Sequence, residues 1–223
     1  MNLSYYKQGI SFALRENRVN VLVIENSDVL VDVVQDLYAQ KEGREGGLVL
    51  AEGEKIYPFQ KNVSVILEPF SLNMNERKIQ TQLYQEIKEE AYGGAFTETL
   101  AIQKELMQYL DRILFRVPYP VTYTEEFDLN GFLKWMKVSL ENEAESFLEK
   151  IVQYLRILSA LCRVRVVFFL QLKAFLKEEE LRELYKEAAY CKIQLVLIES
   201  VMRDKMEMED ICIIDRDMCI IQV

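Results

Sequence analysis

The last third of the chain alternates between strand-like and helical segments, and this alternation constrains the fold more than any other feature. Val164–Leu170 and Ile193–Ile198 are rich in β-branched and aromatic residues, and a charged amphipathic helix is predicted between them from about Lys177 to Tyr190. Two strands joined through a helix form a βαβ unit, in which the strands are parallel. Their mostly apolar sequences are typical of strands buried on both faces. We therefore expect an α/β sheet domain.

The first third of the chain adds further strands to this pattern. Apolar, β-branched runs mark the strands, and helical spacing marks one helix that follows the candidate N-caps Asn26, Ser27 and Asp28. The expected elements are a hairpin of Asn2–Tyr6 with Ile10–Leu14, a buried strand Val19–Ile24, a helix over Val29–Tyr38, and strands Leu48–Ala51 and Val63–Leu67.

Helical spacing replaces the strand pattern from about Leu72 onwards. The expected helices lie around Ile79–Ile87, Leu100–Ile113, Leu129–Met136 and Glu141–Cys162. The sequence thus predicts a discontinuous α/β domain of residues 1–70 and 160–223, interrupted by a helical domain of residues 71–159. At the end of the chain, Ile211–Ile214 and Met218–Ile221 are expected to form a terminal strand pair.

The composition excludes several classes of protein. The chain has no histidine, which excludes Ser-His and Cys-His catalytic pairs and His-ligated zinc or iron sites. Its four cysteines show no C-x-x-C spacing, so we expect reduced, mostly buried thiols in a cytoplasmic protein. The N-terminal residues lack the pattern of a secretion signal, and the most apolar stretch is too short for a membrane span. We therefore expect a soluble protein without membrane association.

A parallel sheet invites nucleotide binding, but the motifs for it are missing. Neither G-x-x-x-x-G-K-[ST] nor G-x-G-x-x-G occurs in the chain, so no Gly-rich turn is available to bring backbone N–H groups to a phosphate. Glu25 and Glu199 each follow a predicted strand and could hold Mg²⁺ in an unusual nucleotide hydrolase. Without a phosphate loop, acids at exposed strand ends beside a helix cap are the simpler interpretation.

Positive charge is confined to parts of a chain whose net charge is −9 at pH 7. Ile151–Leu176 holds no acidic residue, and residues 55–88 also carry more basic than acidic residues. These groups could form phosphate-binding surfaces, or they could be ordinary solvated and ion-paired side chains. The bases are Arg156, Arg163, Arg165 and Lys173 in the first group, and Lys55, Lys61, Arg77, Lys78 and Lys88 in the second.

The segment Glu125–Gly131 is acidic and precedes a predicted helix. Its carboxylate and amide oxygens are the hard donors that Ca²⁺ or Mg²⁺ prefers. The spacing differs from that of an EF-hand, and Asp128 could serve only as the N-cap of the helix. The sequence leaves both interpretations open.

Several segments, taken in order, resemble one known family. They are Val21–Asn26, Val65–Phe70, Arg77–Ile79, Phe132–Lys134, Leu172–Leu176, Ile193–Ser200 and Ile214–Asp217. Together they cover nearly the whole length, and they resemble the small accessory DNA-ring protein of type II-A CRISPR–Cas adaptation modules. Lys177 departs from that pattern, because the family usually has Thr or Ser there to cap the following helix.

The resemblance implies a nucleotide-hydrolase-like α/β head without a phosphate loop, an inserted helical leg and a homotetrameric ring. It also implies sequence-independent binding of double-stranded DNA ends during spacer acquisition, with Ca²⁺ as the cofactor. The CRISPR integrase complex and the RNA-guided nuclease are the implied partners. Transferred to this sequence, the metal ligands are Glu125, Glu126 and Asp128, and the DNA-binding cations are Arg77, Lys78, Lys134, Lys137 and Lys173.

These expectations agree with the charge of the chain. A subunit with a net charge of −9 repels DNA from its outer surface, whereas a few cations repeated by the symmetry of a ring can face phosphates inside its opening. The sequence shows no general base next to a Ser, Lys or Tyr side chain that could act as a nucleophile. We therefore expect a protein that is not an enzyme. Two alternatives stay open: a degenerate Mg²⁺-dependent nucleotide hydrolase, and an acidic protein–protein scaffold of the adaptation complex.

Overall fold

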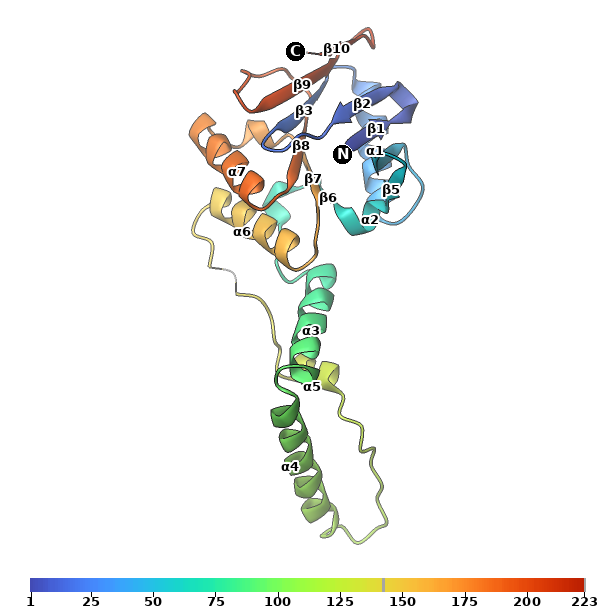
Figure 1. Ribbon diagram of the computed structural model, residues 1–223, viewed down its shortest axis with the longest axis vertical. Coiled ribbons are helices and arrows are strands. Elements are labelled where there is room, and N and C mark those ends of the chain that lie inside the picture. Colours follow the sequence, from blue (N-terminus) through green and yellow to red (C-terminus); the bar gives the residue numbers. More distant parts are fainter. Residues whose placement is uncertain (142, 223) are drawn as a thin grey trace. The chain divides into compact units, whose positions relative to one another are not determined.

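The computed structural model describes residues 1–141 and 143–222 and shows a mixed α/β chain (Figure 1). The chain divides into two compact units, Met1–Met74 with Asn142–Val223 and Asn75–Glu141. The first unit holds both β-sheets, and the second is helical. The helical insertion expected at residues 71–159 is longer than this second unit, because the last of its four expected helices belongs to the first unit.

Six strands form the larger sheet: β3 (Val19–Ile24), β6 (Val63–Ile66), β7 (Val166–Leu170), β8 (Gln194–Glu199), β9 (Glu209–Ile214) and β10 (Ile220–Gln222). Their order is β10-β9-β3-β8-β7-β6, and all neighbours are parallel except β10, which pairs antiparallel with β9. The inner strands β3, β7 and β8 are almost wholly buried, which explains their continuous apolar sequences. The predicted βαβ unit and terminal strand pair are confirmed.

Four strands form a smaller antiparallel sheet: β1 (Asn2–Tyr5), β2 (Ile10–Ala13), β4 (Leu48–Glu52) and β5 (Lys55–Tyr57). Their order is β2-β1-β4-β5, so β2 and β5 are its edges. The predicted N-terminal hairpin is confirmed, with Asn2 opposite Ala13. It belongs to a sheet separate from the parallel one.

Helices cover both faces of the larger sheet. They are α1 (Ser27–Lys41), α2 (Phe59–Asn62), α6 (Phe147–Ala160) and α7 (Glu178–Tyr190), with short 3₁₀ turns η1 (Tyr6–Gln8), η2 (Pro69–Ser71) and η3 (Leu172–Ala174). In Figure 1, α6 and α7 lie on one side of this sheet, whereas α1 and the smaller sheet lie on the other. One hydrophobic core joins α1, the smaller sheet and the facing side chains of the larger sheet.

Helix α6 begins at Phe147, so the predicted start at Glu141 is wrong. The Ser146 hydroxyl accepts a hydrogen bond from the Glu149 N–H, and the Glu149 carboxylate accepts one from the Ser146 N–H. This capping box satisfies two N–H groups that a helix terminus otherwise leaves unpaired, which fixes the start of the helix. The acidic residues before it lie outside the helix.

The second unit consists of α3 (Arg77–Tyr92), α4 (Phe96–Leu114) and α5 (Leu129–Trp135). A break at Gly93 and Gly94 separates α3 from α4, between the helices expected around Ile79–Ile87 and Leu100–Ile113. Irregular chain with two prolines, Pro118 and Pro120, then leads to α5, whose N-cap is Asp128. No helix in the described part of the chain is both long and apolar enough to cross a membrane.

A buried carboxylate attaches the smaller sheet to α1. Asp36 of α1 accepts hydrogen bonds from the Tyr5 hydroxyl (3.0 Å), the Lys7 ammonium (2.8 Å) and the Gly47 N–H (3.2 Å). Burial by itself would raise the pKa of Asp36, but the hydrogen bonds from Lys7 and Tyr5 outweigh it and lower that pKa below its ordinary value. A Cβ at Gly47 would lie 2.4 Å from the Tyr5 ring, so this close approach requires glycine.

We predict that Asp36→Asn destabilises the protein by about 1 kcal/mol at pH 7, because the new amide group cannot accept all three hydrogen bonds. A lowered folded-state pKa stabilises the fold above the unfolded pKa of about 4, and this contribution disappears as the pH falls through the folded value. Urea unfolding at pH 7 and pH 3 measures both effects. The difference between the variant and the wild type should shrink at pH 3, and an unchanged difference would contradict an ionised Asp36.

Candidate nucleic-acid interface

The turn after β3 contains a helix cap where a nucleotide-binding sheet would have a phosphate loop. The Asn26 side-chain oxygen accepts hydrogen bonds from the backbone N–H groups of Asp28 and Val29, both at 3.1 Å. Its amide nitrogen donates to the Arg216 carbonyl at 3.0 Å. Two of the first N–H groups of α1, those of Asp28 and Val29, are therefore already bonded within the protein. Glu25 beside them is exposed.

Glu199, the second acid proposed for Mg²⁺ in the hydrolase alternative, is buried at the end of β8. Its Oε1 accepts the Lys173 N–H at 2.9 Å, and its Oε2 has no hydrogen-bond partner among the described residues. Burial raises the pKa of Glu199, which favours the neutral form. Glu25 and Glu199 thus have opposite environments, and the buried one is poorly suited to bind a hydrated cation.

Lys173 is buried, which removes it from the predicted set of DNA-binding cations. Its ammonium donates to both carboxylate oxygens of Glu209 (2.8 and 2.9 Å) and to the Asp204 carbonyl (3.0 Å). The Tyr185 hydroxyl donates to the same carboxylate at 2.6 Å, and burial together with the Glu209 charge raises the pKa of Tyr185. With side-chain exposures of 4% for Lys173 and 0% for Glu209, the charge is neutralised inside the protein.

Two other bases of the acid-free stretch also have partners within the protein. Arg156 forms an ion pair with Glu187 at 2.7 Å, and the Arg165 guanidinium lies 4.9 Å from the centre of the Tyr57 ring. The interpretation of this stretch as paired side chains therefore holds for Arg156, Arg165 and Lys173. Arg163, the fourth base of the stretch, is exposed.

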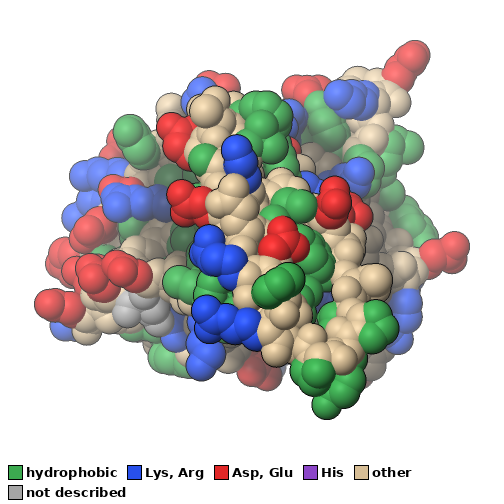
Figure 2. Space-filling model, turned by 90° about the horizontal axis from the view of Figure 1, so that it is seen from below, with side chains coloured by type: hydrophobic (Ala, Val, Ile, Leu, Met, Phe, Trp, Pro, Cys, Tyr) green, Lys and Arg blue, Asp and Glu red, His purple; other side chains and the backbone are tan. Residues whose placement is uncertain are grey.

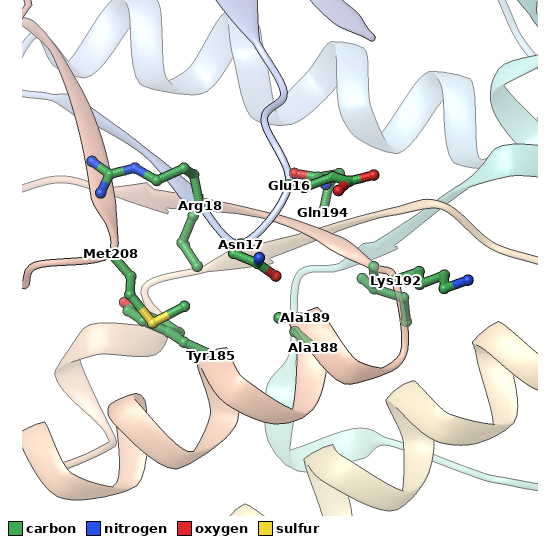
Figure 3. Close-up of a pocket in the computed structure, with 11 residues that line it drawn as sticks. Glu16, Asn17, Arg18, Tyr185, Ala188, Ala189, Lys192, Gln194 and Met208 are labelled. Carbon is green, nitrogen blue, oxygen red and sulfur yellow. The ribbon is translucent and has the colours of Figure 1, made fainter.

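A cavity of about 330 Å³ lies at the amino ends of β3 and β8. Figure 3 shows Tyr185, Ala188 and Ala189 of α7 on one side of it, whereas the Arg18 and Lys192 side chains extend in opposite directions. The Arg18 guanidinium is bonded to Asp210 and to the Glu207 carbonyl. The two cations do not converge, so this cavity offers no anion site.

Four of the five predicted DNA-binding cations belong to the helical unit, where they lie in or next to α3 and α5. Arg77 and Lys78 are exposed in the first turn of α3, Lys134 is exposed in the last turn of α5, and Lys137 follows it. Arg77, Lys134 and Lys137 form no ion pair with any described residue. Cations at a helix N-terminus oppose the helix dipole, so Arg77 and Lys78 do not stabilise α3.

Three hydrogen bonds hold the segment after α5 against α3 and the chain just before α3. The Asn75 side chain donates to the Leu140 carbonyl (2.9 Å) and accepts from the Leu140 N–H (2.8 Å), and the Tyr84 hydroxyl donates to the Val138 carbonyl (3.1 Å). Lys137 has a φ of 54°, in the left-handed region, which turns the chain after α5. These contacts place Lys137 near Tyr84, well along α3, whereas Arg77 and Lys78 lie in the first turn of that helix.

The predicted metal ligands are exposed and only partly gathered. Glu126 and Asp128 line a cavity of about 660 Å³ in the helical unit, together with Thr124, Asn130 and Lys88. Asp128 also accepts the Gly131 N–H at 2.9 Å as the cap of α5. Among the described residues no group of three or more His, Cys, Asp or Glu side chains is arranged to hold a metal ion. Glu125 does not line this cavity; its carbonyl accepts a hydrogen bond from Gln103.

We predict that Lys173→Met destabilises the protein by about 3–5 kcal/mol, because it leaves the Glu209 carboxylate buried without its counter-charge. The double variant Lys173→Met with Glu209→Met should recover much of this stability. Urea unfolding measures both, and DNA affinity per folded molecule should equal that of the wild type. A stable Lys173→Met variant with weakened DNA binding would contradict the structural role.

Comparison with models of protein families supports the resemblance found in the sequence. Residues 40–218 match the Cas_Csn2 family model, described as CRISPR-associated protein, and this match spans most of the chain. A comparison with curated proteins found no match. The matched range contains the whole helical unit and both strands of the βαβ unit. The chain therefore belongs to the Cas_Csn2 family of CRISPR-associated proteins.

Proposed function

We propose that this protein binds the ends of double-stranded DNA, without sequence preference, as a homotetrameric ring that serves CRISPR spacer acquisition. Membership of the Cas_Csn2 family indicates a role in CRISPR adaptation. In this proposal the first unit is a nucleotide-hydrolase-like head without a phosphate loop, and the helical unit is the leg. The CRISPR integrase complex and the RNA-guided nuclease are the proposed partners, and the cytoplasm is the proposed location.

The observation that carries the proposal is that Arg77, Lys78, Lys134 and Lys137 are all exposed on the helical unit, in a chain whose net charge is −9. Cations in one place attract a polyanion despite the negative charge elsewhere, because at physiological salt the field of distant charges is screened within about 8 Å. Contacts to phosphates carry no base sequence, so such a surface would bind any duplex.

The ring requires contacts between copies, and α4 offers a surface for them. This helix of 19 residues buries one residue among those described, Thr99. Five of its apolar side chains on one side are between 39% and 48% exposed: Phe96, Leu100, Leu106, Leu110 and Ile113. Figure 2 shows exposed hydrophobic side chains beside Lys and Arg side chains on one face of the molecule. Helices gain most of their stability from packing an apolar face, so a second copy is the proposed cover.

Calcium is proposed at the acidic segment of the helical unit. Glu126 and Asp128 line one cavity with the hydroxyl of Thr124 and the amide of Asn130, and such oxygen donors suit Ca²⁺. Glu125 is adjacent in sequence and would complete the set only by a local rearrangement. A bound cation would neutralise these carboxylates and so reduce their repulsion of nearby phosphates.

A role without catalysis fits the residues present. The amino end of α1 is capped by Asn26, Glu199 is buried, and the chain has no histidine. No observation favours the hydrolase alternative over DNA binding.

We predict that replacing Arg77, Lys78, Lys134 and Lys137 by Gln weakens binding to linear duplex DNA and flattens its dependence on salt. The slope of log K against log salt should decrease by about 0.9 for each phosphate that is no longer neutralised. Fluorescence anisotropy at several salt concentrations measures the slope.

We also expect wild-type protein to bind linear DNA more tightly than covalently closed circular DNA, and chelation of Ca²⁺ to reduce that preference.

Replacing Lys41, Lys61, Lys186 and Lys192 by Gln gives the matched control, because it removes the same number of charges and all four lysines are exposed in the first unit. This control should keep the wild-type slope. A similar weakening in the control would show that total charge matters rather than this group of cations, and equal binding of linear and circular DNA would contradict entry from an end. Unaltered binding after chelation would remove Ca²⁺ from the proposal.

We predict that Leu106→Glu breaks the tetramer into smaller species, because it places a charge in the proposed contact between α4 helices. Leu106 is 42% exposed, so the subunit itself should stay folded. Sedimentation velocity gives the mass, and circular dichroism checks the fold. Gln108→Glu adds the same charge on the polar side of α4 and should leave the mass unchanged. A tetramer that survives Leu106→Glu would place the contact elsewhere.

A further inference from the structure

A cavity in the first unit lies between the smaller sheet and one edge of the larger one. Its volume is about 350 Å³, and residues of β2, β3, β9 and β10 line it. In Figure 1, the edge strand β2 of the smaller sheet and the strands β9 and β10 of the larger sheet all lie toward the top of the view. Neither the cations of the helical unit nor its acidic segment contributes to this cavity, so it is independent of the proposed DNA interface.

The backbone of β2 is free along the edge that faces this cavity. The Leu14 N–H donates to the Met1 carbonyl at 2.8 Å, and bonded pairs alternate along an antiparallel ladder. With Leu3 opposite Phe12, Phe12 is therefore bonded to β1, whereas Ser11 and Ala13 direct their N–H and C=O groups away from it. β2 is an edge of its sheet, and both Ser11 and Ala13 line the cavity.

A buried donor without a partner lies in the same cavity. Asn20 of β3 is 2% exposed, and its amide nitrogen has no hydrogen-bond acceptor among the described residues. Its neighbour in the adjacent strand, Asp210, is bonded to the Arg18 guanidinium. A buried amide N–H without an acceptor is unfavourable, so an acceptor supplied by a ligand here would strengthen its binding.

One cation beside the cavity has no counter-charge. Arg15 is exposed, lines the cavity and forms no ion pair with any described residue. The other lining charge, Asp210, is paired with Arg18. A ligand with a carboxylate near Arg15 therefore fits the charge of the cavity better than a cationic one.

We propose that this cavity binds an extended, acidic segment of a partner protein, which adds to β2 as a further antiparallel or parallel strand. Ser11 and Ala13 would form the backbone ladder, Asn20 would donate to a backbone carbonyl of the segment, and Arg15 would pair with its carboxylate. Addition of a strand to a free edge is a common mode of peptide recognition, in which backbone hydrogen bonds give affinity and side-chain contacts give specificity. A nucleic acid lacks the alternating donors and acceptors that this edge requires.

The test uses the full-length protein and a fluorescein-labelled heptapeptide of alternating valine and threonine with a central aspartate. We expect saturable binding by fluorescence anisotropy. Hydrogen exchange should then slow at the Ser11 and Ala13 amides, whereas the Phe12 amide, already bonded to β1, should change little. A peptide with N-methyl groups on alternate residues should bind at least about threefold more weakly.

Ala13→Pro removes one outward N–H without disturbing the ladder to β1, and proline is tolerated at such edge positions. It should weaken peptide binding about threefold to tenfold, whereas Ala13→Ser keeps the N–H and should bind as the wild type does. Arg15→Glu should weaken the aspartate peptide and favour a version with central lysine. No binding at 1 mM peptide, full binding by Ala13→Pro, or exchange protection away from β2 would each overturn the proposal. DNA affinity should be unaffected in all three variants.

Discussion

The buried ion pair between Lys173 and Glu209 holds together the parts of the first unit that follow the parallel strands. Lys173 lies in η3 after β7, Glu209 begins β9, and Tyr185 comes from α7, so one carboxylate connects three elements. Removing two charges from water is costly, and the cost is offset here because the ammonium and the carboxylate use nearly all their hydrogen-bonding capacity on each other and on neighbouring groups. This arrangement also positions the loop before β9, because Asp204 and Met206 bond to the same pair through their backbone.

The two units differ in how they use their positive side chains. In the first unit, Arg18, Arg156 and Lys173 are bonded to carboxylates, so they contribute to the fold and leave little positive charge for a ligand. In the helical unit, Arg77 and Lys134 stay exposed without such partners among the described residues. Charge that is unnecessary for folding is available for binding, which is why the proposed DNA interface belongs to the helical unit.

Local sequence patterns predict the helices and strands, but they do not predict which distant side chains contact each other. The buried strand Val19–Ile24 and the βαβ unit were predicted because strand and helix periods are local properties of the sequence. The start of α6 was missed although its capping box, Ser146 with Glu149, was present in the sequence. The resemblance assigned Lys173 to DNA, and its pairing with Glu209, 36 residues away, cannot be predicted from any local pattern. The same limit applies to Asn75 and Leu140, whose contact over 65 residues holds Lys137 beside α3.

The cap at the start of α1 has a consequence for how this fold can change. Asn26 binds the amides of Asp28 and Val29 with one end of its side chain and the Arg216 carbonyl with the other. A substitution that freed those amides for a phosphate would also release the turn between β9 and β10 from its anchor. Freeing those amides for a phosphate would therefore loosen the C-terminal hairpin at the same time, so a substitution of Asn26 would have two effects.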